Sequence, residues 1–234
     1  MSYVEEHNIK AFCLDVDGTL YPRRQMNVRL VRSAFPSLSI GLRFNGVRKK
    51  YRMTQESTPP REDSRRGLLE KQASLFLKNK SDKDSVEKMI KKMDKQFYKS
   101  WAKSFLSIKA YPNMVEALTL AKEQGIKIAV LSDFPLEKKL ETLGIAHLVD
   151  FALSSEDTGY LKPSNKAFDI LCKGVGERPE NCLYFGDSYD KDIIGGSGFN
   201  MHTLYIKKTS HKEKYPKASI ICGNWKDVIK LTLR

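Results

Sequence analysis

The chain has 234 residues, of which 41% are hydrophobic and 29% are charged, and its net charge is +13. These proportions are ordinary for a globular protein and exclude a disordered chain, while the length allows one large domain or a core with an insertion. No stretch approaches the roughly 20 apolar residues that span a bilayer, and residues 1–10 lack the apolar run of a signal peptide. We therefore expect a cytoplasmic protein, monomeric or dimeric, without a membrane partner.

The positive charge is concentrated in one segment. Residues 22–110 hold 23 Lys and Arg against 8 Asp and Glu, a balance of +15, whereas the rest of the chain has 18 against 20, a balance of −2. A local excess of this kind either attracts anionic substrates or forms a solvated helix face. The first half of the segment contains Arg23, Arg24, Arg29, Arg32, Arg43, Arg48, Lys49, Lys50 and Arg52. For each residue taken alone the solvated face is the preferred interpretation, particularly for Lys88, Lys91, Lys92, Lys95, Lys99 and Lys103.

The cysteine pattern indicates neither disulfides nor a metal site. The four cysteines lie far apart inside apolar segments, without C-x-x-C spacing and without a nearby histidine. We therefore expect Cys13, Cys172, Cys182 and Cys222 to be buried, reduced thiols.

The first predicted element is a buried parallel strand over residues 9–14, because this run is short and almost continuously apolar. The sequence D-V-D-G-T follows directly at residues 15–19. The pattern D-x-D-G-T, which has four fixed residues, matches by chance at about one in 10⁵ starting positions. Asp15 and Asp17 can both face a ligand if the chain turns here, and Gly18 permits a close backbone approach. A divalent cation would relieve the repulsion between the two carboxylates.

Residues 22 to about 106 show helical periodicity without strand-like runs. Residues 68–78 are predicted to be a helix, and residues 54–66 a loop, because the loop contains two prolines and many polar residues. A second amphipathic helix is predicted downstream, capped by Ser81 and Asp84, with a stripe of Met and aromatic residues that indicates packing rather than a cofactor site. We therefore predict an inserted, all-helical domain over residues 22–106.

After this insertion the chain alternates between strand-like and helical segments. Strands are predicted over residues 126–131, 151–153, 182–185, 202–206 and 218–222, and a closing helix over residues 224–233. Alternation of this kind predicts a parallel sheet with helices on both faces. The expected fold is therefore a three-layered, Rossmann-like α/β core formed by residues 1–21 and 107–234.

A second acidic cluster, G-D-S-Y-D-K-D at residues 186–192, follows the strand predicted over residues 182–185. The carboxyl ends of parallel strands meet at one edge of a sheet, where ligands bind. We therefore expect Asp187 to reach Asp15 and Asp17 and to complete an oxygen-rich site. Hard oxygen ligands together with a phosphate favour Mg²⁺ as the cofactor.

Two further strand ends carry polar residues. Ser132 and Asp133 follow the apolar residues 129–131, and Lys162 lies in the run G-Y-L-K-P-S. Each is a weak signal alone, because a Ser or a Lys in a loop is usually solvated. Their position beside two acidic strand ends favours a role in binding a substrate.

In chain order the first motif is D-V-D-G-T at residues 15–19, the second is Ser132 and Asp133, the third is Lys162, and the fourth is G-D-S-Y-D-K-D at residues 186–192. These four motifs resemble those of the haloacid dehalogenase superfamily, and the resemblance extends over almost the whole chain. It implies that family's core fold with a helical cap inserted between the first and second motifs, which matches residues 22–106. Tyr21 and Pro22 resemble the start of the hinge that leads to the cap. The activity implied is hydrolysis of a phosphoric monoester.

The resemblance also implies roles for individual residues. Asp15 resembles the nucleophile that forms an aspartyl-phosphate, and Asp17 resembles the general acid and base. Ser132 and Lys162 resemble the groups that bind the transferring phosphoryl group and neutralise its charge, and Asp133 accompanies them in binding the substrate.

The metal site implied by the resemblance binds Mg²⁺ through Asp187, the side chain of Asp15 and the backbone carbonyl of Asp17. An ion held there would lie between the first and fourth motifs. The supporting residues of these two motifs are Gly18, Thr19 and Asp192.

The sequence leaves three functions open: a phosphatase, a mutase and a nucleic-acid-binding protein. Asp17 favours phosphate-ester hydrolysis over dehalogenation, because the dehalogenases of the superfamily lack this aspartate. A sugar-phosphate mutase keeps it, so phosphoglucomutase-like transfer is an alternative. A nucleic-acid-binding protein with a degenerate enzyme core would instead use the basic segment for phosphate contacts. Because every expected catalytic position is filled, we expect a small phosphorylated metabolite as the partner rather than a nucleic acid.

Overall fold

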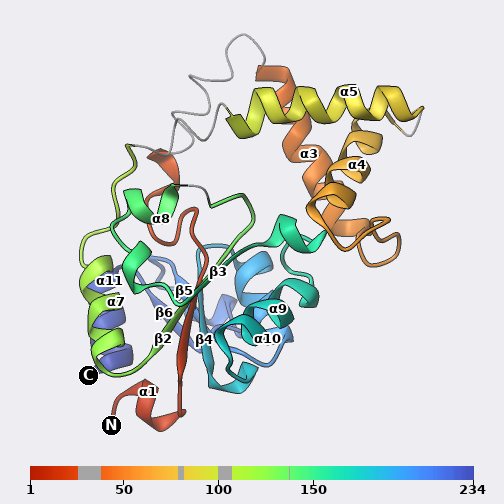
Figure 1. Ribbon diagram of the computed structural model, residues 1–234. Coiled ribbons are helices and arrows are strands. Elements are labelled where there is room, and N and C mark those ends of the chain that lie inside the picture. The colour runs from red at the N-terminus through yellow and green to blue at the C-terminus, as the bar shows by residue number, and fades with distance from the viewer. Residues whose placement is uncertain (26–37, 79–81, 100–106, 137) are drawn as a thin grey trace.

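The computed structural model describes residues 1–25, 38–78, 82–99, 107–136 and 138–234 (Figure 1). A six-stranded sheet lies at its centre, and all neighbouring strands pair in parallel in the order β3-β2-β1-β4-β5-β6. The strands are β1 (Ala11–Leu14), β2 (Lys127–Ser132), β3 (Phe151–Ser154), β4 (Cys182–Gly186), β5 (His202–Ile206) and β6 (Ile220–Cys222). Every strand predicted from an apolar run is present, so the predicted parallel sheet is confirmed.

Helices cover both faces of the sheet. One face carries α7 (Met114–Glu123) and α11 (Trp225–Val228), the other carries α9 (Asn165–Val175) and α10 (Ile194–Gly198), and α1 (Tyr3–Glu6) precedes β1 (Figure 1). Phe12 and Leu14 of β1 belong to the hydrophobic cluster on the first side, while Ala11 and Cys13 belong to the cluster on the second. Burial on both sides explains why the strand is continuously apolar. The three-layered α/β core is therefore confirmed.

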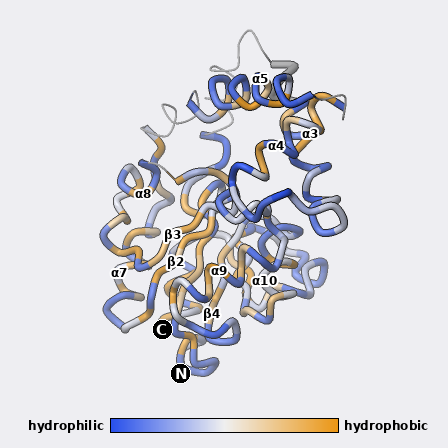
Figure 2. The backbone as a smooth tube through the Cα atoms, turned by 45° about the vertical axis from the view of Figure 1, so that its right-hand side comes forward, coloured by the Kyte–Doolittle hydropathy of each residue, from blue (hydrophilic) through white to orange (hydrophobic). Residues whose placement is uncertain are grey.

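Burial follows the hydropathy of the chain. Hydrophobic residues concentrate in the central strands, whereas the surrounding helices carry hydrophilic segments (Figure 2). The four cysteines are free and buried, as predicted. The predicted closing helix is also present, because α11 continues as a π-helical turn over Ile229–Leu233. Within the described part of the chain, no helix combines the length and the apolar character needed to cross a membrane.

The described part of the insertion, residues 22–25, 38–78 and 82–99, contains helices and no strand. Its helices are α3 (Leu38–Thr54), α4 (Arg65–Phe76) and α5 (Lys83–Met93), followed by a π-helical turn over Asp94–Tyr98. They lie beyond the carboxyl ends of the strands (Figure 1). The helices share a hydrophobic cluster, in which the rings of Phe44 and Phe97 stack with 4.2 Å between centroids. The division of the chain into two domains stays a prediction.

The start of α5 differs from the predicted one. Asp82 is the N-cap, because its carboxylate accepts a hydrogen bond from the backbone N–H of Ser85 at 2.8 Å. Asp84 instead lies in the first turn, where a negative charge interacts favourably with the helix dipole. Ser81 lies outside the described residues. The stripe of Met and aromatic residues contributes to the hydrophobic cluster of the insertion, as predicted for packing.

The C-terminal end of α3 and Gln55, the residue after it, contact the loop that follows β3. Tyr51 donates a hydrogen bond to the carbonyl oxygen of Gly159. The side-chain amide of Gln55 makes two hydrogen bonds with the backbone of Leu161, at 2.8 and 2.9 Å. Lys162 comes next in this loop rather than directly at the end of a strand, so that part of the prediction is wrong. The contacts place α3 beside the third predicted motif.

Candidate active site

Asp15 lies at the centre of a buried group at the carboxyl end of β1. Nζ of Lys162 is 2.6 Å from Asp15 Oδ1 and 2.7 Å from Asp192 Oδ1. The Thr19 hydroxyl donates a hydrogen bond to Asp15 Oδ2 at 2.9 Å. The structure therefore brings together residues of the first, third and fourth predicted motifs.

Burial governs the charges of this group. It raises the pKa of Asp15 to about 7, although the Lys162 ammonium opposes the change. Burial alone would lower the pKa of Lys162, but the carboxylates of Asp15 and Asp192 outweigh it and raise that pKa well above its usual range. Lys162 is therefore a permanent ammonium, and it favours the ionised form of Asp15.

Three carboxylates form a set suited to a metal ion, which we call the acidic set. Oxygen atoms of Asp15, Asp187 and Asp192 lie within 4.8 Å of one another. Hard oxygen donors of this kind fit Mg²⁺. Gly18 has a φ of +110°, and a Cβ atom there would lie 2.1 Å from Asp187 Oδ2. The first motif therefore requires glycine at this position, because any side chain would collide with the acidic set.

Arg23 contacts the acidic set from the start of the predicted insertion. Its Nη2 is 2.8 Å from Asp187 Oδ1 and 3.2 Å from the backbone oxygen of Asp17. Both residues belong to the metal site that the family resemblance implies. In the sequence Arg23 is one of many cations, and nothing in its spacing distinguishes it.

The carboxylate of Asp17 has partners of its own. Nζ of Lys139 is 3.1 Å from both of its oxygens, and the Tyr21 hydroxyl donates a hydrogen bond to Oδ1. Burial alone would raise the pKa of Asp17, but Lys139 and Tyr21 outweigh it, and the pKa is lowered. Asp17 is therefore a carboxylate at neutral pH. Its backbone oxygen, through Arg23, is what links it to Asp187.

Lys139 is a site residue that the sequence analysis missed. It begins α8 (Lys139–Thr142) and is completely buried. Its neighbour Lys138 is exposed. Two adjacent lysines in a polar stretch normally indicate exposed side chains. Only the position of Lys139 shortly after the second motif could have suggested that it belongs to the site.

Ser132 ends β2, and Asp133 follows it. The Ser132 hydroxyl oxygen accepts a hydrogen bond from the backbone N–H of Phe134 at 3.1 Å. Asp133 Oδ1 accepts one from the backbone N–H of Lys162 at 3.2 Å and another from the Ser155 hydroxyl at 3.0 Å. Asp133 therefore ties the second motif to the third.

Two cations share the other oxygen of Asp133. Nη2 of Arg52 is 2.7 Å from Oδ2, and Nζ of Lys191 is 3.6 Å from it. Burial alone would raise the pKa of Asp133, but these two cations, together with Lys162 and Arg48, hold it well below its usual range. Because Arg52 belongs to α3, this ion pair links the helical insertion to the second motif.

Asp133→Asn is expected to lower the free energy of unfolding at pH 7 by roughly 3 kcal/mol, because Arg52 and Lys191 lose their shared carboxylate. The pKa of Asp133 is lower in the folded state than in the unfolded state. Its contribution to stability is therefore present above about pH 4 and is lost as the pH falls below that value. Urea unfolding at pH 7 and pH 3 should show a gap between wild type and variant that narrows in acid.

An ion pair on the surface provides the control for this experiment. The pair of Asp169 and Lys173 joins side chains that are 43% and 74% exposed. Asp169→Asn should change the free energy of unfolding by less than about 1 kcal/mol. An Asp133→Asn gap of the same size at both pH values would contradict the ionised state assigned to Asp133.

A second buried ion pair joins the insertion to the core. Arg48 of α3 donates a hydrogen bond to Glu156, and only 2% of the Arg48 side chain is exposed. Glu156 also accepts hydrogen bonds from the Tyr98 hydroxyl at 2.9 Å and from Arg65 at 3.3 Å. The solvated-face interpretation is therefore wrong for Arg48, because Glu156 supplies a buried counter-charge.

The lysines of α5 and of the turn after it agree with the solvated-face interpretation. The exposed ones are Lys88, Lys91, Lys92, Lys95 and Lys99. Lys103, Arg29 and Arg32 lie outside the described residues. The described lysines of α5 and of the turn after it are therefore exposed, whereas Arg48 and Arg52 of α3 contact the core.

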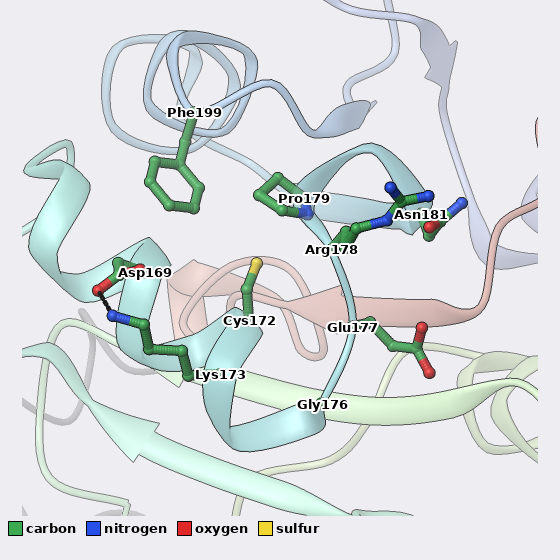
Figure 3. Close-up of a pocket in the computed structure, with 9 residues that line it drawn as sticks. All are labelled: Asp169, Cys172, Lys173, Gly176, Glu177, Arg178, Pro179, Asn181 and Phe199. Carbon is green, nitrogen blue, oxygen red and sulfur yellow. Dashed lines mark hydrogen bonds and ion pairs between the residues drawn. The ribbon is translucent and has the colours of Figure 1, made fainter.

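A separate pocket of about 360 Å³ lies beside the C-terminal end of α9 (Figure 3). It is lined by Asp169, Cys172, Lys173, Gly176, Glu177, Arg178, Pro179, Asn181 and Phe199. Asp169 and Lys173 pair with each other there, at 2.6 Å. None of the predicted site residues lines this pocket, so it is distinct from the candidate active site.

Comparison with known proteins identifies the family. Residues 9–200 match the haloacid dehalogenase-like hydrolases. The chain therefore belongs to this family of hydrolases, as its four motifs predicted.

Proteins similar to this chain include two phosphatases and one mutase of known structure. The chain is 28% identical over 214 residues to a glyceraldehyde 3-phosphate phosphatase of Methanopyrus kandleri, covering 89% of this chain and 88% of that protein. It is 29% identical over 125 residues to a phosphoglycolate phosphatase of Haemophilus influenzae, covering 52% and 55%. A solved β-phosphoglucomutase from Clostridium difficile superposes with a TM-score of 0.66 at 20% identity, covering 94% of this chain and 93% of the other. This last similarity concerns the fold alone.

Proposed function

We propose that this protein is a magnesium-dependent phosphatase that hydrolyses a small phosphate monoester through an aspartyl-phosphate on Asp15. The observation that carries the proposal is the pairing of two buried carboxylates with two separate buried lysines, Asp15 with Lys162 and Asp17 with Lys139. One carboxylate can then attack phosphorus while the other transfers a proton. The phosphatase names of the two relatives support the same chemistry.

In the proposed reaction, Asp15 attacks the phosphorus atom and the ester oxygen departs. The Lys162 ammonium, beside Asp15, would stabilise the negative charge on the phosphoryl oxygens in the transition state. The Ser132 hydroxyl, at the end of the neighbouring strand, would donate a hydrogen bond to the same oxygens. Because Lys162 is also bonded to Asp192, its ammonium is held in place before the substrate arrives.

Asp17 has the second role in this proposal. It would protonate the leaving oxygen and then accept a proton from the water that hydrolyses the aspartyl-phosphate. With Lys139 and Tyr21 bonded to it, Asp17 is a carboxylate, which is the form that the second step needs. Protonation for the first step requires the ion pair with Lys139 to lengthen. Lys139 therefore controls the balance between the two forms of Asp17.

The carboxylates of Asp15, Asp187 and Asp192, with the backbone oxygen of Asp17, would hold the Mg²⁺ ion. When bound, the ion offsets the negative charge of the phosphoryl oxygens and of the carboxylates around them. Close packing of Gly18 against Asp187 would keep the first and fourth motifs together with and without the bound ion.

We also propose that residues 22–106 act as a cap over a catalytic core of residues 1–21 and 107–234. The hydrogen bonds of α3 with the loop after β3, and the ion pair of Arg52 with Asp133, support this arrangement. A closed cap would exclude bulk water from the aspartyl-phosphate. The cations of the cap would also raise the local concentration of phosphate esters.

Arg23→Ala is expected to lower the Mg²⁺ concentration for half-maximal activity by about two- to fivefold. The reason is that the guanidinium competes with the ion for Asp187 Oδ1 and the backbone oxygen of Asp17. A Mg²⁺ titration of phosphate release measures the effect. Arg24→Ala is the matched control, because Arg24 is also exposed and the change removes the same charge. A higher Mg²⁺ requirement in Arg23→Ala would indicate instead that Arg23 helps to assemble the site.

The proposed function is tested by a Mg²⁺-dependent phosphate-release screen across sugar phosphates, nucleotides and short phosphorylated acids, with Asp15→Asn as the blank. Release of inorganic phosphate by the wild type alone supports a phosphatase. Formation of an isomeric phosphate ester without release would support the mutase alternative. Inactivity across the panel, together with salt-dependent binding of oligonucleotides, would support the nucleic-acid-binding alternative.

A further inference from the structure

Charge is distributed unevenly around the proposed active site. At the acidic set, the three carboxylates of Asp15, Asp187 and Asp192 contact two cations, Lys162 and Arg23. By direct contacts, this side of the site therefore has one carboxylate more than it has cations, which suits the proposed metal ion.

The side toward α3 has the opposite balance. Two carboxylates there contact four cations among the described residues. The contacts are Asp133 with Arg52 and Lys191, and Glu156 with Arg48 and Arg65. An excess of positive charge next to a phosphoryl site favours a further anion, because an opposite charge nearby stabilises each cation.

Two of these cations keep hydrogen-bond donors for a ligand. Nζ of Lys191 is 3.6 Å from Asp133 Oδ2, which is longer than a hydrogen bond, and no other described residue accepts one from it. Arg52 uses Nε and Nη2, on the Lys162 backbone oxygen and on Asp133, while its Nη1 has no partner in the described part of the chain. The two side chains are 27% and 22% exposed, so neither is closed off from solvent.

Both cations lie near residues of the proposed active site. Burial raises the pKa values of Asp15 and Asp187, and the charge of Lys191 is one of the effects that oppose this rise. Nε of Arg52 is 3.1 Å from the backbone oxygen of Lys162. Arg52 and Lys191 therefore both lie against Asp133, which follows Ser132 and is bonded to the backbone N–H of Lys162.

We propose that Arg52 Nη1 and Lys191 Nζ form a subsite for a second acidic group of the substrate. The preferred substrate is then a short phosphate monoester that also bears a carboxylate or a second phosphate. This inference rests on the proposed phosphatase function and adds the substrate class to it. The ester phosphate would bind at Lys162 and Ser132, while the second oxyanion would take charge-assisted hydrogen bonds from the two donors that Asp133 does not use.

A series of two-carbon esters tests the subsite, because only the second group changes. Its members are 2-phosphoglycolate, 2-hydroxyethyl phosphate and 2-aminoethyl phosphate, which end in a carboxylate, a hydroxyl and an ammonium. For the wild type with Mg²⁺ we expect kcat/KM to fall in this order, with the carboxylate about tenfold above the hydroxyl. Ethane-1,2-diol bisphosphate then decides whether a carboxylate or a phosphate is the better second group.

The result also separates this inference from the proposed function. Turnover of all three esters with equal kcat/KM would overturn the subsite and leave the phosphatase intact. No turnover of any ester would overturn both. A preference for the ammonium ester would overturn the subsite alone.

Substitutions of Arg52 and Lys191 test whether these two residues form the subsite. Arg52→Gln and Lys191→Gln should each lower the ratio of kcat/KM for the carboxylate over the hydroxyl by about tenfold, and Arg52→Lys should retain part of it. This ratio does not depend on the folded fraction of a variant, and Lys191 lies outside the insertion, so a loosened α3 would not explain both losses. Arg61→Gln removes the same charge from an exposed arginine and should leave the ratio unchanged. An equal loss for every ester in both variants would overturn the subsite, because the cations would then serve the ester phosphate only.

Discussion

Asp15→Asn is expected to reduce kcat by on the order of 10⁴-fold or more, because an amide does not attack phosphorus and no aspartyl-phosphate forms. The fold should persist. Asn has almost the same size, its side-chain oxygen can still accept the hydrogen bond from Thr19, and burial already disfavours the charge of Asp15. Phosphate release with Mg²⁺, measured beside thermal unfolding, separates the loss of the nucleophile from a loss of structure.

Asp190→Asn is the matched control for this variant. Asp190 lies in the fourth-motif segment, is exposed, and loses the same charge. Because a surface substitution changes free energies by roughly 0.5 kcal/mol or less, kcat should stay within about twofold of the wild type. Activity of Asp15→Asn above about one tenth of the wild-type value would reject Asp15 as the nucleophile.

The sheet and several candidate site residues were predictable because they depend on local signals. Continuous apolar runs predict buried parallel strands, and the topology carries the polar residues directly after them to one edge. Asp15, Ser132 and Asp187 are placed in this way without any tertiary information. Lys162 follows no strand directly, so its assignment depended on the family resemblance as well.

The side-chain partners of Asp17 could not be predicted from a local sequence pattern. Lys139 is 122 residues away from Asp17 in the sequence, and its polar neighbours suggest surface. The pairing depends on where α8 packs against the strand ends, which is a tertiary property that a local pattern does not contain. Tyr21 lies only four residues after Asp17, yet its hydroxyl is aimed by the turn rather than by its spacing.

The basic insertion illustrates the same limit. Composition counts every cation alike, whereas the structure pairs Arg48 and Arg52 with carboxylates of the core and leaves the described lysines of α5 in solvent. Glu156, the partner of Arg48, lies in a polar turn sequence that is typical of surface, but it is completely buried. A prediction of these contacts would have required the position of α3 on the core.

Lys139→Met is expected to lower both stability and activity. The change leaves the buried Asp17 carboxylate without its ammonium partner, which should lower the free energy of unfolding by roughly 3 kcal/mol. Met keeps the length and most of the apolar volume of the Lys side chain, so the effect of the charge dominates. Lys138→Met is the matched control, because Lys138 is the adjacent, exposed lysine and should change stability little. Urea unfolding of the two variants measures the difference.

The pH dependence of kcat then separates a role in the reaction from a role in packing. Burial raises the pKa of Asp17 and Lys139 lowers it, so removal of Lys139 raises this pKa. The acid limb of the pH profile, below which Asp17 no longer accepts a proton from water, should move to higher pH, so kcat should fall more at acidic pH than at alkaline pH relative to the wild type. Lys139→Arg keeps the positive charge and should restore most of the profile. A Lys139→Met variant that loses stability but keeps the wild-type profile would limit Lys139 to packing, and Tyr21 would then be the group that holds Asp17 in its ionised form.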